Sequence, residues 1–304
     1  MKDDIRDDEI RILGGTERKP TPKPSDRKRN LPWWAIVPLA VVIAGGLIGL
    51  CVVLCMPSAE QEEVGVFDHE AVVEQPHPLC GWLQQQEALC GYADTTGMAR
   101  HRYTATKDTV VNDIPLRIYF PLNATPHLEV GYRCTRDTAH AILFFQAADV
   151  RADNGKIVGA FVLQGMPLSW GLSKRGYCAI IDQKVSVGVA DNSPLFEEAT
   201  ERNGDFFRQY PLVDRGMLVE NVLKAKFVRR GLCELEGRIV VVETETQESM
   251  HDFAQALTDI GVSNAIYLIG GDAISWHRDR NNTGHPSGLW EPKKYKNISF
   301  IVWQ

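Results

Sequence analysis

The stretch 229–279 changes its hydrophobic period twice, and this pattern constrains the fold more than any other part of the chain. Residues 238–244 (RIVVVET) are rich in β-branched side chains, which predicts a buried strand. The apolar residues that follow fall at helical spacing up to Gly261, a typical stop for a helix. Residues 265–268 restore a strand, and Gly270-Gly271 comes just after it. The pattern therefore predicts a strand–helix–strand unit.

Strands and a few helices alternate along the rest of the chain, which predicts an α+β or α/β fold with a mixed sheet and few helices. In a parallel strand–helix–strand unit, ligands gather just beyond the carboxyl ends of the strands. Gly270, Gly271 and Asp272 occupy that place here, so we expect them to form the rim of a site.

A series of motifs in 141–276 follows a recognisable order. Phe144-Phe145 is followed by a glycine-punctuated hairpin at 154–171, a second hairpin at 177–189 and then Tyr210-Pro-Leu-Val213. The strand–helix–strand unit described above completes the series. This order resembles the phosphodiester glycosidase family, over roughly half of the chain.

The resemblance implies an enzyme that breaks the bond between a sugar's anomeric carbon and a phosphate oxygen. Arg229 matches the family's arginine. The family's acid before the glycines is replaced by Ile269, and its Asn-Gly-Gly before the paired phenylalanines is replaced by residues 141–143. Two hypotheses therefore stay open: either the carboxylate has moved, perhaps to Asp272, or the scaffold binds without cleaving.

Phosphodiester chemistry needs a cation for the leaving phosphate and a carboxylate for the oxocarbenium-like transition state. Arg229 and Arg230 are the arginine candidates, and Asp272 is the first candidate for the carboxylate because it follows the glycines. Weaker candidates for the carboxylate, each at a strand or loop end, are Asp149, Asp191 and Glu243.

Other residues are candidates for substrate binding. Ser249 and His251 begin the predicted helix, where free backbone N–H groups favour anions, although Ser249 can equally cap the helix. Trp276, with Trp290 and Tyr295 further along the chain, offers a flat apolar face on which a sugar ring can stack.

Residues 33–56 carry no charge and are long enough to cross a bilayer, for which about 20 apolar residues suffice. Basic residues crowd 18–29 before this segment, while acids dominate 60–70 after it. We therefore predict a disordered cytoplasmic tail (1–30), a single transmembrane anchor (31–56), a linker (57–77) and an extracytoplasmic domain (78–304), periplasmic if the cell is bacterial. A cleaved signal peptide would have a shorter apolar region nearer the terminus.

Composition excludes some classes of protein. The net charge is −6 and no broad basic face emerges, which argues against nucleic acid as a partner. No Cys-x-x-Cys or close histidine pair indicates zinc, and no cofactor is predicted. Cys80 and Cys90 flank a helical segment and could form a disulfide, which spacing alone does not establish, whereas Cys178 and Cys233 are expected to be buried.

Taken together, the sequence predicts a membrane-anchored hydrolase that cleaves a sugar–phosphate bond in a glycosyl phosphodiester of envelope glycans. The alternative is a non-catalytic envelope protein that binds an anionic glycan or a protein partner.

Overall fold

The computed structural model describes residues 78–91, 101–131, 140–288 and 297–304, all within the unit Glu74–Gln304. The predicted tail, anchor and linker lie outside these residues, as do Trp290, Tyr295 and the side chains of Cys80 and Cys90. No helix in the described part of the chain is long and apolar enough to cross a membrane.

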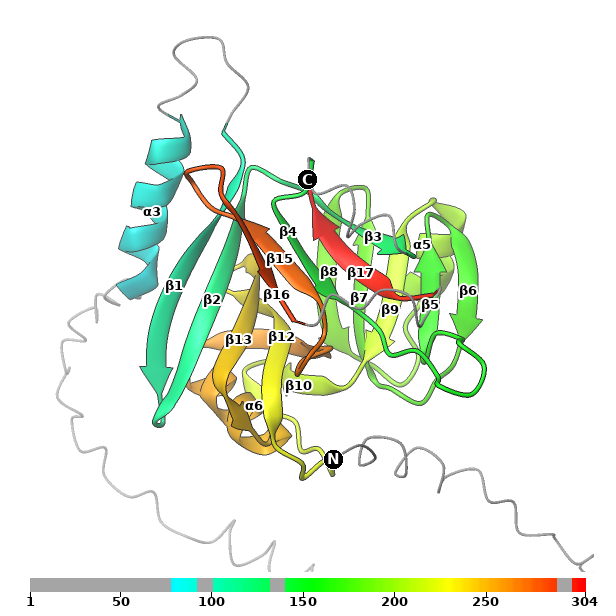
Figure 1. Cartoon of the computed structure of the whole chain (residues 1–304). Coiled ribbons are helices and arrows are strands. Elements are labelled where there is room, and N and C mark those ends of the chain that lie inside the picture. Colours follow the sequence, from blue (N-terminus) through cyan, green and yellow to red (C-terminus); the bar gives the residue numbers. More distant parts are fainter. Residues whose placement is uncertain (1–77, 92–100, 132–139, 289–296) are drawn as a thin grey trace, which may run out of the picture. The chain divides into compact units, whose positions relative to one another are not determined.

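Three antiparallel sheets carry the domain (Figure 1). The seven-stranded sheet runs in the order β1 (Tyr103–Val111), β2 (Ile114–Leu122), β13 (Arg238–Glu248), β12 (Phe227–Leu235), β14 (Val262–Leu268), β10 (Pro211–Asp214) and β11 (Met217–Leu218). One five-stranded sheet contains β16 (Gly284–Ser287), β15 (Ser275–Arg278), β4 (Leu143–Gln146), β17 (Ser299–Trp303) and β3 (Pro126–Val130). The other contains β6 (Met166–Trp170), β5 (Ala160–Leu163), β9 (Asp205–Gln209), β7 (Gly176–Ile181) and β8 (Lys184–Val189). The helices among the described residues are α3 (Pro78–Gly91), α5 (Leu195–Glu201) and α6 (Met250–Asp259).

The predicted mixed sheet, and with it the α+β or α/β class, is wrong: this is a β-rich fold, and every strand pair among the described residues is antiparallel. The predicted strand, helix and strand do form, as β13, α6 and β14. However, β12 lies between β13 and β14 and pairs antiparallel with both. Helix α6 therefore connects two strands that run the same way but are not neighbours.

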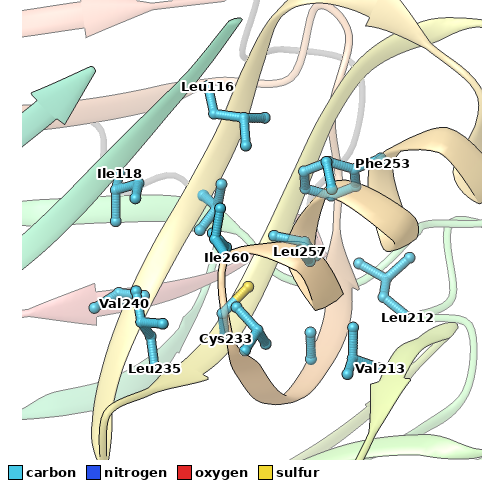
Figure 2. Packing of buried hydrophobic residues seen from close by; sticks show 14 of the residues in the cluster. Leu116, Ile118, Leu212, Val213, Cys233, Leu235, Val240, Phe253, Leu257 and Ile260 are labelled. Carbon is cyan, nitrogen blue, oxygen red and sulfur yellow. The ribbon is translucent and has the colours of Figure 1, made fainter. Parts of the chain in front are cut away.

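Helix α6 is stabilised by a cap at its N-terminus and by an apolar face that packs in the core. Ser249 is the N-cap, and its hydroxyl accepts the backbone N–H of Asp252 at 3.0 Å. The buried side chains of the helix include Phe253 and Leu257, which recur at helical spacing. Figure 2 shows both packed with residues such as Cys233 of β12.

The seven-stranded sheet buries both of its faces. One face packs under α6 and α3, and the other packs on the two five-stranded sheets through Tyr119, Leu232 and Leu268. Cys233 and Cys178 are buried free thiols, as predicted, and burial raises the pKa of each.

The Gly270-Gly271 pair follows β14 and turns back onto β12. The backbone N–H of Gly271 donates to the carbonyl of Val228 at 2.9 Å, and Gly271 has a φ of 59°. A Cβ on Gly270 would collide with the same Val228 carbonyl, whereas a Cβ on Gly271 would meet nothing within 4 Å. The two glycines are therefore needed for different reasons, close approach at Gly270 and positive φ at Gly271.

Gly270→Ala is expected to lower the free energy of unfolding by about 2–3 kcal/mol, because the methyl group forces the backbone of β12 and the turn apart. Gly271→Asn should cost less than about 1 kcal/mol, because asparagine tolerates positive φ and the space is open. Urea unfolding of both variants measures the difference. Equal losses would contradict the close approach at Gly270.

Candidate functional site

A row of alternating charges crosses four strands of the seven-stranded sheet and ends beside the glycine turn. Asp108, Arg117, Glu243 and Arg230 are direct cross-strand neighbours on β1, β2, β13 and β12. Arg230 is in turn opposite Leu268, the last residue of β14. Opposite charges directly across a sheet attract, so the row fixes the register of these strands.

Arg230 joins this row to the glycine turn. Its side chain is 1% exposed, and its Nε donates to Glu243 at 2.9 Å. Its Nη1 donates to the backbone carbonyls of Ile269 at 3.2 Å and Ala273 at 2.7 Å. The guanidinium also lies over the ring of Phe145. A buried guanidinium needs partners for its N–H groups, and here the two ends of the turn supply them.

A second polar cluster lies where β9 ends. The Lys174 ammonium, 1% exposed, forms an ion pair with Asp149 and donates to Gln209 Oε1 at 3.0 Å. The amide of Gln209 donates to the same Asp149 oxygen at 3.2 Å, and the Lys174 ammonium lies 4.6 Å from the centre of the Tyr210 ring. The Asp149 side chain is 35% exposed. The Asp149 carboxylate is therefore partly open to solvent, while Lys174 and Gln209 bind it from the buried side.

The backbone that carries Lys174 is fixed by another buried arginine. Arg208 donates to the carbonyls of Lys174 at 2.9 Å, Ala190 at 3.0 Å and Asp191 at 3.0 Å. Burial lowers the pKa of Arg208. Since all three acceptors are backbone carbonyls of two loops, Arg208 positions the Lys174 loop rather than binding a ligand.

Tyr267 connects this cluster to the glycine turn and to Arg229. Its phenol oxygen accepts the N–H of Gly270 at 3.1 Å. Burial raises the pKa of Tyr267 and the Asp149 carboxylate raises it further, whereas the Gly270 N–H and the Arg229 guanidinium lower it. The Arg229 guanidinium and the Asp149 carboxylate, from distant parts of the chain, thus shift the pKa of this phenol in opposite directions.

Arg229 itself is 3% exposed and strongly held. Its Nε donates to the Glu248 carbonyl at 2.8 Å, and its Nη2 donates to the Ala225 carbonyl. Its guanidinium lies 5.4 Å from the centre of the Phe227 ring and 5.8 Å from that of Tyr267. These contacts fix the position of the charge next to the turn.

The other predicted site residues lie apart from this arrangement. Asp272 is exposed on the turn, and its carboxylate forms no ion pair or hydrogen bond with the described residues. Ser249 caps α6, and its hydroxyl also donates to the Asp252 carboxylate at 2.7 Å. His251 is exposed and lies 3.2 Å from Glu220. Asp191 forms an exposed ion pair with Arg175.

Trp276 is 7% exposed and packs in the interior instead of facing solvent. Its indole stacks on Phe144 with ring centroids 6.0 Å apart, and Arg278 lies over it at 5.3 Å. Gly284 of strand β16 lies against the edge of the Trp276 indole.

Sequence reasoning missed Lys174, Gln209 and Tyr267. Each is a polar residue next to or within an apolar strand, and nothing in the local pattern distinguishes it from a surface residue. In the part of the chain that the structure describes, no group of three or more His, Cys, Asp or Glu side chains is arranged to hold a metal ion.

No protein family model and no curated protein matches the chain. Several solved structures are similar to it, among them the following two. One is the catalytic domain of zebrafish N-acetylglucosamine-1-phosphodiester alpha-N-acetylglucosaminidase, auto-inhibited by its pro-peptide, with 14% identity, a TM-score of 0.47, and coverage of 66% of this chain and 82% of that one. The other is a hypothetical protein from Synechocystis, with 13% identity, a TM-score of 0.49, and coverage of 66% and 61%. These values describe a distant likeness of fold.

Arg230→Met is expected to lower the free energy of unfolding by about 3–4 kcal/mol, because Glu243 loses its cation and two turn carbonyls lose their donor. The double variant Arg230→Met/Glu243→Leu should recover at least about 1 kcal/mol of that loss, because no uncompensated charge stays buried.

The control is Arg175→Met, which breaks an exposed ion pair and should cost less than about 0.5 kcal/mol. Denaturant unfolding measures all three variants. A loss for Arg230→Met as small as that for Arg175→Met would show that Arg230 does not hold the turn.

Proposed function

We propose that the domain 78–304 is a glycosidase-like hydrolase that cleaves the bond between a sugar and phosphate in a glycosyl phosphodiester. The observation that carries the proposal is the partly exposed Asp149 carboxylate, held by the buried Lys174 ammonium and by the Gln209 amide. Beside the glycine turn lies the Tyr267 phenol, whose pKa the Asp149 and Arg229 charges shift in opposite directions. The order of sequence motifs that resembles the phosphodiester glycosidases supports the same class of reaction.

Asp149 takes the role that the sequence first suggested for Asp272. A carboxylate that must attack a carbon needs a fixed position, and Asp149 has two donors that fix it. Asp272 has no such partner among the described residues. The replacement of the family's strand-end acid by Ile269 is then compensated from the loop after β4.

In the proposed reaction, an oxygen of Asp149 attacks the anomeric carbon of the sugar. The bond from that carbon to the phosphate oxygen breaks, and its electron pair leaves with the phosphate. The departing phosphomonoester is already an anion, so it needs a positive charge more than a proton. Arg229, whose guanidinium lies 5.8 Å from the centre of the Tyr267 ring beside the turn, is the arginine proposed to supply this charge. Water then hydrolyses the glycosyl ester and regenerates the carboxylate.

A second candidate function is binding of an anionic glycan without cleavage. Both arginines at the turn donate to backbone carbonyls and are 3% and 1% exposed, which favours a structural role for them. Under this alternative, the Asp149 cluster would contact a ligand, and no bond would break. The partner is still predicted to be a glycosyl phosphodiester or an anionic glycan. The domain is still predicted to lie outside the cytoplasm.

Asp149→Asn is expected to lower turnover of a sugar-1-phosphodiester roughly a thousandfold, because the nucleophilic oxygen is lost. Affinity for a non-hydrolysable phosphonate analogue should change less than about tenfold, because Arg229 is intact. The assay follows release of the phosphomonoester in ¹⁸O-labelled water, and the label should enter the sugar and not the phosphate.

The matched control is Asp153→Asn, which removes an exposed carboxylate from the same loop and should leave turnover unchanged. Wild-type turnover in Asp149→Asn, or label in the phosphate, would reject the proposed mechanism. Binding of the analogue by a wild-type protein that releases no product would favour the second candidate function.

A further inference from the structure

Strands β15 and β16 form a hairpin in which, among the described residues, the outer strand β16 pairs with β15 alone. β16 pairs with β15 at the edge of its sheet, and all four of its residues are exposed. Gly284 of β16 lies against the indole of Trp276, and a Cβ there would come within 2.8 Å of the ring nitrogen. The hairpin therefore covers a tryptophan that the sequence suggested as a sugar-stacking residue.

Two histidines face each other across this hairpin. His277 and His285 are direct cross-strand partners, and their rings stack with centroids 4.6 Å apart and planes 15° apart. Stacked imidazoles attract or tolerate each other while at least one is neutral, and they repel when both are protonated. The hairpin thus contains a pair of groups whose mutual interaction changes sign with pH.

His277 is surrounded in a way that opposes its protonation. Tyr119 of β2 meets its ring edge-on at 5.2 Å, and Arg117 of the same strand adds a positive charge. His285 Nε2 lies 3.0 Å from Asp279, the one neighbouring group that favours a charged His277. Burial, followed by His285 and Arg117, lowers the pKa of His277 to about 4.

The remaining elements packed near the hairpin add little charge at His277. On β4, Leu143 is the cross-strand partner of His277. His101, just before β1, bonds to the Arg280 carbonyl at the hairpin turn. Arg278 points instead at Asn282 and at the Trp276 ring.

We propose that the β15–β16 hairpin is an acid-opened lid over Trp276, with the His277–His285 pair as its trigger. Opening lets water reach His277, so that its ring takes up a proton more readily than in the closed hairpin, where burial, His285 and Arg117 oppose the charge. The indole of Trp276 becomes accessible at its Gly284 edge. This inference goes beyond the proposed function and does not depend on hydrolysis.

The direction of the pH effect follows from the number of protons that the open and closed forms of the hairpin bind. In the open form the pKa of His277 should lie near that of free histidine, 6.5. In the closed form it is about 4. The open form therefore holds more protons between these two values, so opening becomes easier as pH falls. From pH 7 to pH 5 the opening equilibrium should rise roughly twentyfold.

Hydrogen–deuterium exchange of the β16 amides, corrected for the intrinsic effect of pH, measures this equilibrium in the full chain. The wild type should show the roughly twentyfold rise in exchange, while amides of β12 and β13 stay protected. His277→Gln should abolish the rise, and the control His251→Gln, on α6, should retain it. Acrylamide quenching of tryptophan fluorescence should increase in the wild type at pH 5, and this increase should be absent in Trp276→Phe.

Gly284→Ala tests the lid with both histidines present. The added methyl group presses on the indole, so β16 exchange should already be high at pH 7. Unchanged β16 exchange in the wild type at pH 5, an equal rise in β12 and β13, or the same rise in His277→Gln would each overturn the proposal.

Discussion

The buried guanidinium of Arg230 is the constraint on which the arrangement of the site depends. Its Nε donates to Glu243 within the row of charges across the sheet, and its Nη1 donates to the carbonyls at both ends of the glycine turn. A buried guanidinium without partners would cost several kcal/mol, so the turn cannot move independently of the sheet. The position of everything attached to the turn follows from this contact.

Two functional elements are attached to that turn. On one side, the backbone N–H of Gly270 donates to the Tyr267 phenol, whose pKa is shifted by the Arg229 and Asp149 charges. On the other side, the turn leads into β15, and Gly288 after β16 packs closely against the Ala273 backbone that Arg230 holds. The proposed catalytic carboxylate and the proposed lid are therefore connected through one short segment. The proposed acid-induced movement of the hairpin would therefore reach the site through this segment.

The local features of the fold were predictable from the sequence, and the pairing of strands was not. β13, α6 and β14 follow from hydrophobic period, the Ser249 cap and Gly261, all of which are local. The insertion of β12 between β13 and β14 depends on pairing between distant segments, so the parallel unit was predicted wrongly. The same holds for the site: the glycine pair and Arg229 carry local signals, but the contacts of Lys174 with Asp149 and Gln209 join residues that are distant in the sequence.

NMR of the Arg230 side-chain nitrogens tests most directly whether its guanidinium is locked to the glycine turn. A locked guanidinium should give two separate Nη resonances with slow rotation, and scalar couplings through the hydrogen bonds to the carbonyl carbons of Ile269 and Ala273. A single averaged Nη resonance, typical of a freely rotating surface arginine, would contradict this locked arrangement.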